Sequence, residues 1–61
     1  MKHRDGDYCR FVDRYGKERE GIICFLTTTS GGGYRFDLLV YEGCGFIELR
    51  GFYGEDVKFL T

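Results

Sequence analysis

The sequence predicts a single all-β domain built from five short strands, and three observations favour it. Five segments rich in β-branched and aromatic residues follow one another at a spacing of roughly 8–12 residues, which is typical of a small barrel or sandwich. Turns that contain glycine separate them, and the chain has ten Gly and no Pro. Nowhere do apolar residues recur with the period of an amphipathic helix over about 11 residues.

The strands are expected at residues 8–13, 21–29, 34–41, 46–50 and 57–60. Glycines at 16, 31–33, 43–45, 51 and 54 lie between them, and glycine adopts the positive φ angles of tight turns without strain. Residues 51–56 are too few for an α-helix and suit one 3₁₀ turn. We therefore expect a 3₁₀ turn directly before the last strand.

The second and third strands are expected to form a hairpin around the flexible loop 30–33. In the register that we favour, Phe25 lies opposite Phe36 and Ile23 lies opposite Leu38. Cross-strand partners share one face of a sheet. These four side chains are therefore expected to point into the core.

The other face of this hairpin is also apolar, and it carries Ile22, Cys24, Leu26, Leu39 and Tyr41. A small barrel has only one interior, so these side chains are either exposed or covered by something else. Contiguous exposed apolar patches usually mark interaction sites. Two alternatives stay open: the face binds a protein, or residues 1–4 or the last strand fold over it.

Length and composition predict one domain at residues 6–61, preceded by a flexible N-terminus at residues 1–5. No apolar run approaches the ~18 residues of a membrane span, and none follows the basic start as in a signal peptide. We therefore expect a cytoplasmic protein with no membrane contact, whose three cysteines are reduced.

Charge argues against a dedicated nucleic-acid reader, because nine Lys and Arg residues are mixed with ten Asp and Glu residues. Proteins that bind nucleic acids usually show a basic stripe. Basic and aromatic residues nevertheless alternate early in the chain, and an RNA- or DNA-binding barrel remains the alternative hypothesis. Its contacts would be Arg10, Arg14, Tyr15, Lys17 and Arg19.

No residues are spaced for catalysis or metal binding. Structural zinc sites normally use Cys pairs two to four residues apart, and Cys9, Cys24 and Cys44 form no such pair. His3, the only histidine, lies in a segment expected to fray, which is a poor support for catalysis. We expect no enzymatic activity, no cofactor, no metal and no small-molecule substrate.

The order of these features resembles the SH3-like small barrel over residues 6–60. The residues that carry the resemblance are Gly6-Asp7, Gly16-Lys17, Glu20-Gly21-Ile22-Ile23, Tyr34, the strand 46–49 and the closing strand 56–60. The resemblance implies a five-stranded SH3-like barrel with a 3₁₀ turn before the fifth strand. Fold-level likeness carries no function by itself.

Three relatives within that class are similar in part. The turn from Gly16 to Ile23 is similar to that of KOW-type barrels, which bind RNA or the transcription and translation machinery. Length and strand order look like type II dihydrofolate reductase, a tetramer of SH3-like chains. The segment Phe46-Ile47-Glu48-Leu49 departs from that family's Val-Gln-Ile-Tyr run, so no catalytic residue is carried over. In size, the chain also looks like phage and mobile-element proteins that bind a host protein.

The sequence thus predicts a small non-enzymatic protein-binding module. We expect it to associate with itself as a homo-oligomer, a dimer or larger, and to use the outer face of the central hairpin. A host protein bound by a phage or mobile-element product is the other kind of partner that this hypothesis includes.

Overall fold

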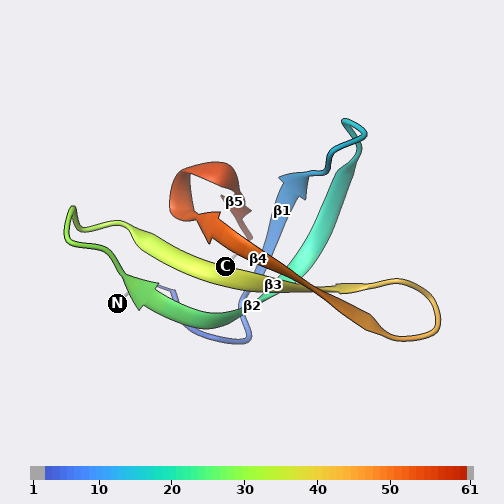
Figure 1. The fold of residues 1–61 in the computed structure, drawn as a ribbon, viewed down its shortest axis with the longest axis horizontal. Helices are drawn as coiled ribbons and strands as arrows, with labels where there is room; N and C mark the ends of the chain where they lie inside the picture. Colours follow the sequence, from blue (N-terminus) through green and yellow to red (C-terminus); the bar gives the residue numbers. More distant parts are fainter. Residues whose placement is uncertain (1–2, 61) are drawn as a thin grey trace.

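The computed structural model describes residues 3–60, which form one five-stranded antiparallel sheet (Figure 1). The elements are β1 (Tyr8–Val12), β2 (Glu18–Thr28), β3 (Tyr34–Tyr41), β4 (Phe46–Tyr53), the 3₁₀ helix η1 (Gly54–Asp56) and β5 (Lys58–Phe59). The predicted all-β class, the five strands and the 3₁₀ turn before the last strand are confirmed.

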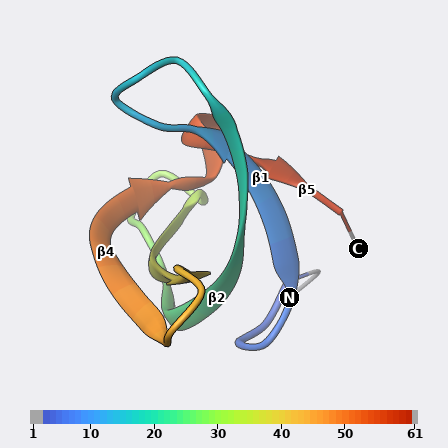
Figure 2. The same cartoon turned by 90° about the vertical axis from the view of Figure 1, so that its right-hand side faces the viewer.

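The strands are arranged in the order β4-β3-β2-β1-β5. Figure 2 shows that β2 and β4 curve strongly, so the sheet wraps around its own inner face. Within residues 3–60, β4 and β5 do not pair with each other. The sheet is therefore an open, barrel-like curl in which both outer strands keep one unpaired edge.

The inner face holds a compact core. Alternate residues of β1 and β3 point inward, as the two-residue period of a strand requires. Phe52 packs edge-to-face on Phe11 with ring centroids 5.3 Å apart, and it stacks near Phe36. The fully buried set is Cys9, Phe11, Ile23, Phe36, Leu38 and Val40.

The central hairpin has the predicted register over its middle section. Ile22 pairs with Leu39, Ile23 with Leu38 and Cys24 with Asp37. Ile23 and Leu38 are both buried, so their predicted core position is confirmed.

Beyond Cys24 the predicted register is wrong, because a β-bulge lies between Cys24 and Thr27. Phe25 takes a positive φ of 54° there, and its side chain is 68% exposed. Leu26 turns inward and packs against the core instead. A bulge inserts one residue and so exchanges the two faces of a strand. Phe25 is therefore not a core residue, and Leu26 is not an outer-face residue.

Strand β4 also differs from expectation, since it continues to Tyr53 rather than ending at residue 50. Gly51, expected in a turn, has a φ of 82° within the strand, next to a second register shift. The Gly51 N–H donates to the Asp37 carboxylate at 3.1 Å. The glycine therefore bends the strand without ending it.

Residues 3–5, expected to belong to a flexible terminus, contact the sheet. The Asp5 carboxylate accepts a hydrogen bond from the Leu26 N–H at 2.9 Å. The His3 ring stacks on Phe59 with centroids 3.7 Å apart and meets the Tyr34 ring edge-on. Both aromatic partners pack against the core cluster. His3 thus packs on the inner side of the sheet, whereas Asp5 bonds to the backbone of the β2 bulge.

Candidate functional site

The outer face of the hairpin keeps four of the five residues predicted for an interface. Ile22, Cys24 and Leu39 are half-buried there, and Tyr41 is 61% exposed. Leu26 is the exception, because the bulge turns it into the core. The four side chains belong to neighbouring strands, so the sheet brings them together.

These side chains help to form a concave surface, which we call the outer groove. It has a volume of about 290 Å³ and is lined by Tyr8, Glu20, Gly21, Ile22, Leu39, Tyr41 and Phe46. Ile22 and Leu39 form its half-buried floor, and the exposed rings of Tyr8, Tyr41 and Phe46 stand along its rim. The groove therefore offers aliphatic contact below and aromatic contact around it.

Two of the rim residues, Tyr8 and Phe46, were missed in the sequence. Tyr8 pairs with Ile22 across the β1–β2 ladder, and Phe46 pairs with Tyr41 across the β3–β4 hairpin. Alternation with the core residue Cys9 places Tyr8 outward, and this signal is present in the sequence. Phe46 needs the hairpin register, which the turn at residues 42–45 sets.

The rim is held in place by local contacts. The Tyr41 and Phe46 rings meet edge-to-face with centroids 5.5 Å apart. The Tyr41 hydroxyl donates a hydrogen bond to the Gly43 carbonyl. Edge-to-face aromatic pairs are favoured by the ring quadrupoles. These two contacts fix the orientation of the rings on this side of the groove.

Nothing among the described residues covers the groove. His3 packs on the inner side, Asp5 bonds to the Leu26 N–H outside the groove lining, and β5 pairs with β1 through Cys9 and Arg10. The sequence left open whether the N-terminus or the last strand covers the outer face. In the part of the chain that the structure describes, neither of them does so.

Carboxylates near the groove stand beside basic side chains. Glu20 lines the groove and lies opposite Arg10 on β1. Glu48, which pairs with Arg50, and Asp37 act on Cys24 on the same outer face. Burial, followed by the Asp37 and Glu48 carboxylates, raises the pKa of the Cys24 thiol. A thiol with a raised pKa is a poor nucleophile at neutral pH. The Cys24 thiol on this face is therefore not activated for nucleophilic attack.

The three cysteines are free thiols in different surroundings. Cys9 is fully buried, Cys24 lies on the outer face and Cys44 is exposed between β3 and β4. Burial, with Glu20 adding to it, raises the pKa of the Cys9 thiol to about 11. Among residues 3–60, no group of three or more His, Cys, Asp or Glu side chains is placed to hold a metal ion.

The structure separates the five residues of the nucleic-acid hypothesis. Arg10 lies on the outer face and pairs with Glu18 at 3.6 Å. Arg19 lies opposite Phe11 and so on the inner face. Arg14, Tyr15 and Lys17 lie in the exposed turn and at its end, where the Arg14 guanidinium sits 5.9 Å from the centre of the Tyr15 ring.

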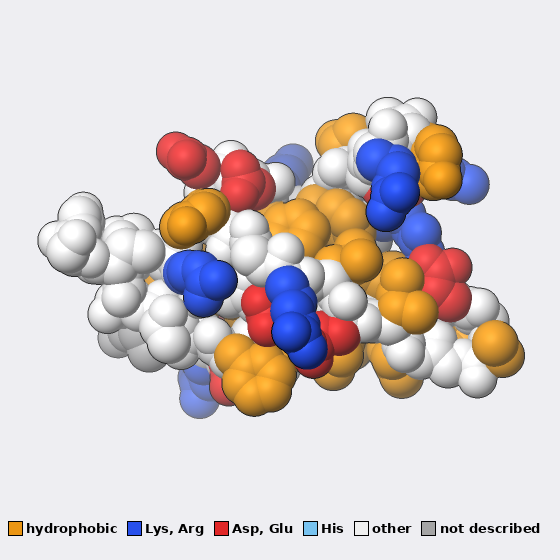
Figure 3. Space-filling model, in the orientation of Figure 1, with side chains coloured by type: hydrophobic (Ala, Val, Ile, Leu, Met, Phe, Trp, Pro, Cys, Tyr) orange, Lys and Arg blue, Asp and Glu red, His pale blue; other side chains and the backbone are white. Residues whose placement is uncertain are grey.

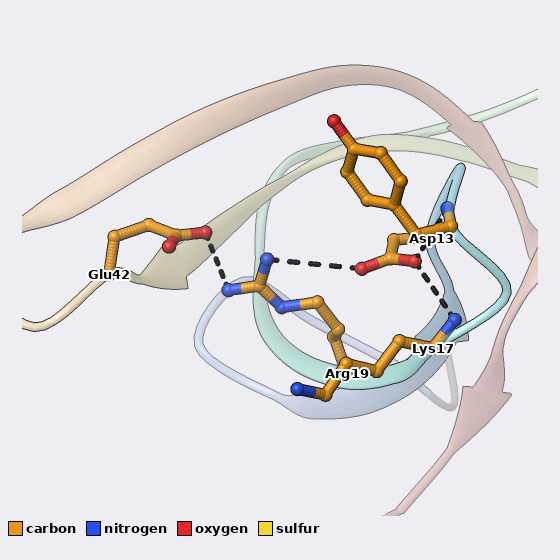
Figure 4. A network of polar contacts seen from close by, with 5 residues as sticks. Asp13, Lys17, Arg19 and Glu42 are labelled. Carbon is orange, nitrogen blue, oxygen red and sulfur yellow. Dashed lines mark hydrogen bonds and ion pairs between the residues drawn. The ribbon is translucent and has the colours of Figure 1, made fainter.

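Arg19 belongs to a polar network that joins two loops (Figure 4). It pairs with Asp13 in the β1–β2 turn and with Glu42 after β3. The Asp13 carboxylate also accepts the backbone N–H groups of Tyr15 and Lys17, each at 2.9 Å. The Arg19 charge is thus already balanced by two carboxylates. In Figure 3, basic and acidic side chains are likewise interspersed on the visible face.

A second hollow, of about 420 Å³, lies at the opposite end of the hairpin. It is lined by Thr29, Gly31, Gly33, Tyr34, Tyr53, Gly54, Glu55 and Phe59. Two of its rings, Tyr34 and Phe59, are already in contact with His3. This hollow includes none of the residues that the sequence singled out for an interface.

No family model, no curated protein and no solved structure matches this chain. Among the described residues, no helix is long and apolar enough to span a membrane.

Proposed function

We propose that this chain is a small non-enzymatic SH3-like module that binds a protein partner in the outer groove and associates with itself. The single observation that carries the proposal is the groove: an aliphatic floor with three exposed aromatic rings around it. The SH3-like assignment is supported by the strand order and by the 3₁₀ turn before the short β5.

The composition of the groove favours a protein over a nucleic acid. Tyr and other aromatic residues are enriched where protein interfaces concentrate their binding energy. Glu20 is the one charged residue among those that line the groove, so the groove lining offers a phosphate group no cation. The partner that fits is a segment with an apolar anchor for the Ile22–Leu39 floor and a basic residue beside Glu20.

Selection of peptides from a displayed random library tests the groove directly. Peptides enriched on the wild-type protein should lose at least about tenfold in affinity for the Ile22→Asp/Leu39→Asp variant, because charges on the floor cannot be desolvated. Val12→Asp is the matched control, since Val12 is an exposed apolar residue outside the groove. Equal binding of the enriched peptides to all three proteins would refute the proposal.

Nucleic-acid binding is the second candidate, and the exposed Arg14–Tyr15 pair is the observation that favours it. Aromatic rings beside Arg can stack on unpaired bases. Fluorescence anisotropy with mixed single-stranded oligonucleotides measures this function. The candidate requires an affinity that falls steeply with salt and is lost in Arg14→Ala/Tyr15→Ala. Absent or salt-independent binding rejects it.

A further inference from the structure

Strand β4 presents a long unpaired edge. It is the last strand of the sheet, it has eight residues, and only its β3 side is paired within the described residues (Figure 1). Three of its large apolar side chains, Phe46, Ile47 and Tyr53, are exposed. Exposed edge strands readily take up another strand by main-chain hydrogen bonding.

The residues that offer free backbone groups can be identified. The Glu42 N–H bonds to the Gly45 carbonyl, and in an antiparallel ladder every second pair from there exchanges hydrogen bonds. Ile47 and Leu49 therefore use their backbone groups toward β3, as Gly51 does toward Asp37. Glu48 and Arg50 direct theirs toward the open edge.

Glu48 and Arg50 also share one face of the strand. The Arg50 Nε lies 2.8 Å from the Glu48 Oε1. The Arg50 side chain is 81% exposed, so its position is not held by packing. An incoming strand would therefore meet one acidic and one basic side chain, two residues apart, beside the backbone groups that it must bond.

The alternation of Glu48 and Arg50 favours a second copy of β4 as the partner strand and one register of pairing between the two strands. A second β4 running antiparallel can place Glu48 opposite Glu48, Arg50 opposite Arg50, or Glu48 opposite Arg50. Like charges directly opposite destabilise a strand pair, whereas opposite charges stabilise it. A register centred on Ile47 would form no charge pair. The register centred on Leu49 forms two Glu48–Arg50 pairs at once.

We propose that two copies of this chain join by antiparallel pairing of residues 47–51 of β4 about a two-fold axis at Leu49. On the inner face, Leu49 meets the partner's Leu49. Ile47 lies across from the partner's Gly51, where no atom lies within 4 Å of the position that a Cβ would occupy. The pairing therefore joins complementary charges on one face and apolar side chains with free space on the other.

This inference goes beyond the proposed function, because it assigns self-association to an edge and not to the groove. The two-fold axis is perpendicular to the joined sheet, so the outer faces of both copies point the same way. Both grooves stay open to a partner. The pairing uses the free β4 edge of each copy, and its two-fold symmetry closes this contact at two copies, while the β5 edges take no part in it.

Charge exchange tests the register, with mass measured by native mass spectrometry and sedimentation. Wild-type protein is expected to be a dimer. Glu48→Arg and Arg50→Glu should each raise the dissociation constant at least about tenfold, because each turns two attractive pairs into repulsive ones. The double variant Glu48→Arg/Arg50→Glu should dimerise again. A mixture of the two single variants should form heterodimers.

Circular dichroism of each variant confirms that it is folded. Single variants that dimerise as well as the wild type would overturn the inference, as would a monomeric wild type or a mixture that forms no heterodimer. The outer-groove variant Ile22→Asp/Leu39→Asp should remain a dimer. If this variant dissociates while Glu48→Arg stays dimeric, the inference of pairing through β4 fails. If this variant stays dimeric and loses only peptide binding, the result concerns the proposed function of the groove and leaves the β4 pairing in place.

Discussion

Phe25 shows how one residue decides which side chains reach the surface. Its positive φ starts the bulge that exposes its own ring and turns Leu26 into the core. Non-glycine residues rarely adopt this conformation, and Asn adopts it more readily than Phe. The Phe25 ring stays largely exposed, so its burial does not offset the cost of the strained backbone. We infer that neighbouring residues set the bulge, among them Asp5, which accepts a hydrogen bond from the Leu26 N–H.

Phe25→Asn is therefore expected to change the free energy of unfolding by less than about 1 kcal/mol, because it removes an exposed ring and eases the backbone. Phe36→Ala should cost about 3 kcal/mol or more, since that ring is 1% exposed. Urea unfolding followed by fluorescence or circular dichroism measures both. Equal losses in the two variants would contradict the bulge and restore Phe25 to the core.

The buried thiol of Cys9 makes the stability of the fold depend on pH. Its pKa rises from the ordinary 9.0 to about 11 in the folded protein. Below pH 9 the thiol is protonated in both states, so it adds no pH dependence. Between about pH 9 and 11 the unfolded chain releases the proton while the native chain keeps it, so stability falls.

The predicted result is a loss of stability from pH 9 to 11 that is smaller in Cys9→Ala than in the wild type. Urea unfolding at several pH values measures the two slopes. Their difference isolates Cys9, because Cys24, whose pKa is also raised, is the same in both proteins. Parallel slopes would mean that the Cys9 thiol is not held in its neutral form by the fold.

At the scale of single elements, the turns are built by side chains as well as by glycine. Asp13 accepts two backbone N–H groups of the β1–β2 turn and pairs with Arg19. Through Glu42, the same arginine connects this turn to the loop after β3. The network thus connects the β1–β2 turn with the loop after β3, through two residues, Arg19 and Glu42, that are 23 positions apart in the sequence.

Asp13→Ala is expected to lower the free energy of unfolding by about 1–2 kcal/mol, because two turn N–H groups lose their acceptor. Glu18→Ala, which removes only a surface ion pair with Arg10, should cost less than about 1 kcal/mol. Thermal or urea unfolding of both variants makes the comparison. A smaller loss in Asp13→Ala than in Glu18→Ala would contradict the role given to the network.

The local sequence pattern was enough to predict the strands, but not the bulges that interrupt them. Strand β3 was predicted at its observed bounds because residues 34–41 are rich in β-branched and aromatic residues and lie between glycine-containing turns. The bulge at Phe25 could not be foreseen, since no glycine marks it. Gly51 led to the opposite error, since it predicted a turn where the strand continues. A glycine with positive φ occurs both in turns and in bulges, so the residue type alone does not distinguish them.

The candidate site was predicted in part for the same reason. Ile22, Cys24, Leu39 and Tyr41 follow from the two-residue period and a correct local register. Phe46 reaches the groove only through the β3–β4 hairpin, and Tyr8 only through the β1–β2 ladder. Such contacts depend on how four strands are placed side by side, which the two-residue period along one strand does not reveal.

At the scale of the whole molecule, a small core faces an apolar outer surface. Within residues 3–60, six buried apolar side chains make up the core, and a domain of about 60 residues buries only about 60% of its unfolded surface. Aromatic rings left exposed at Tyr8, Tyr41 and Phe46 therefore add nothing to the core. These three rings are the ones that the proposed interface uses.

The two proposed surfaces do not compete. The outer groove lies on the face of β1, β2 and β3 and includes Phe46 at the start of β4, whereas the proposed pairing uses residues 47–51 of β4. A dimer formed through β4 would present two grooves on the same side. It would bind a partner that carries two copies of the recognised segment more tightly than one that carries a single copy.

The groove itself is tested most directly by mapping a selected peptide onto the isotope-labelled protein by NMR. The account predicts that the largest amide and side-chain shifts fall on Tyr8, Ile22, Leu39, Tyr41 and Phe46, with little change at the Arg14–Tyr15 turn or at the Tyr34–Phe59 hollow. Shifts concentrated at either of those two places, with the groove residues unchanged, would contradict it.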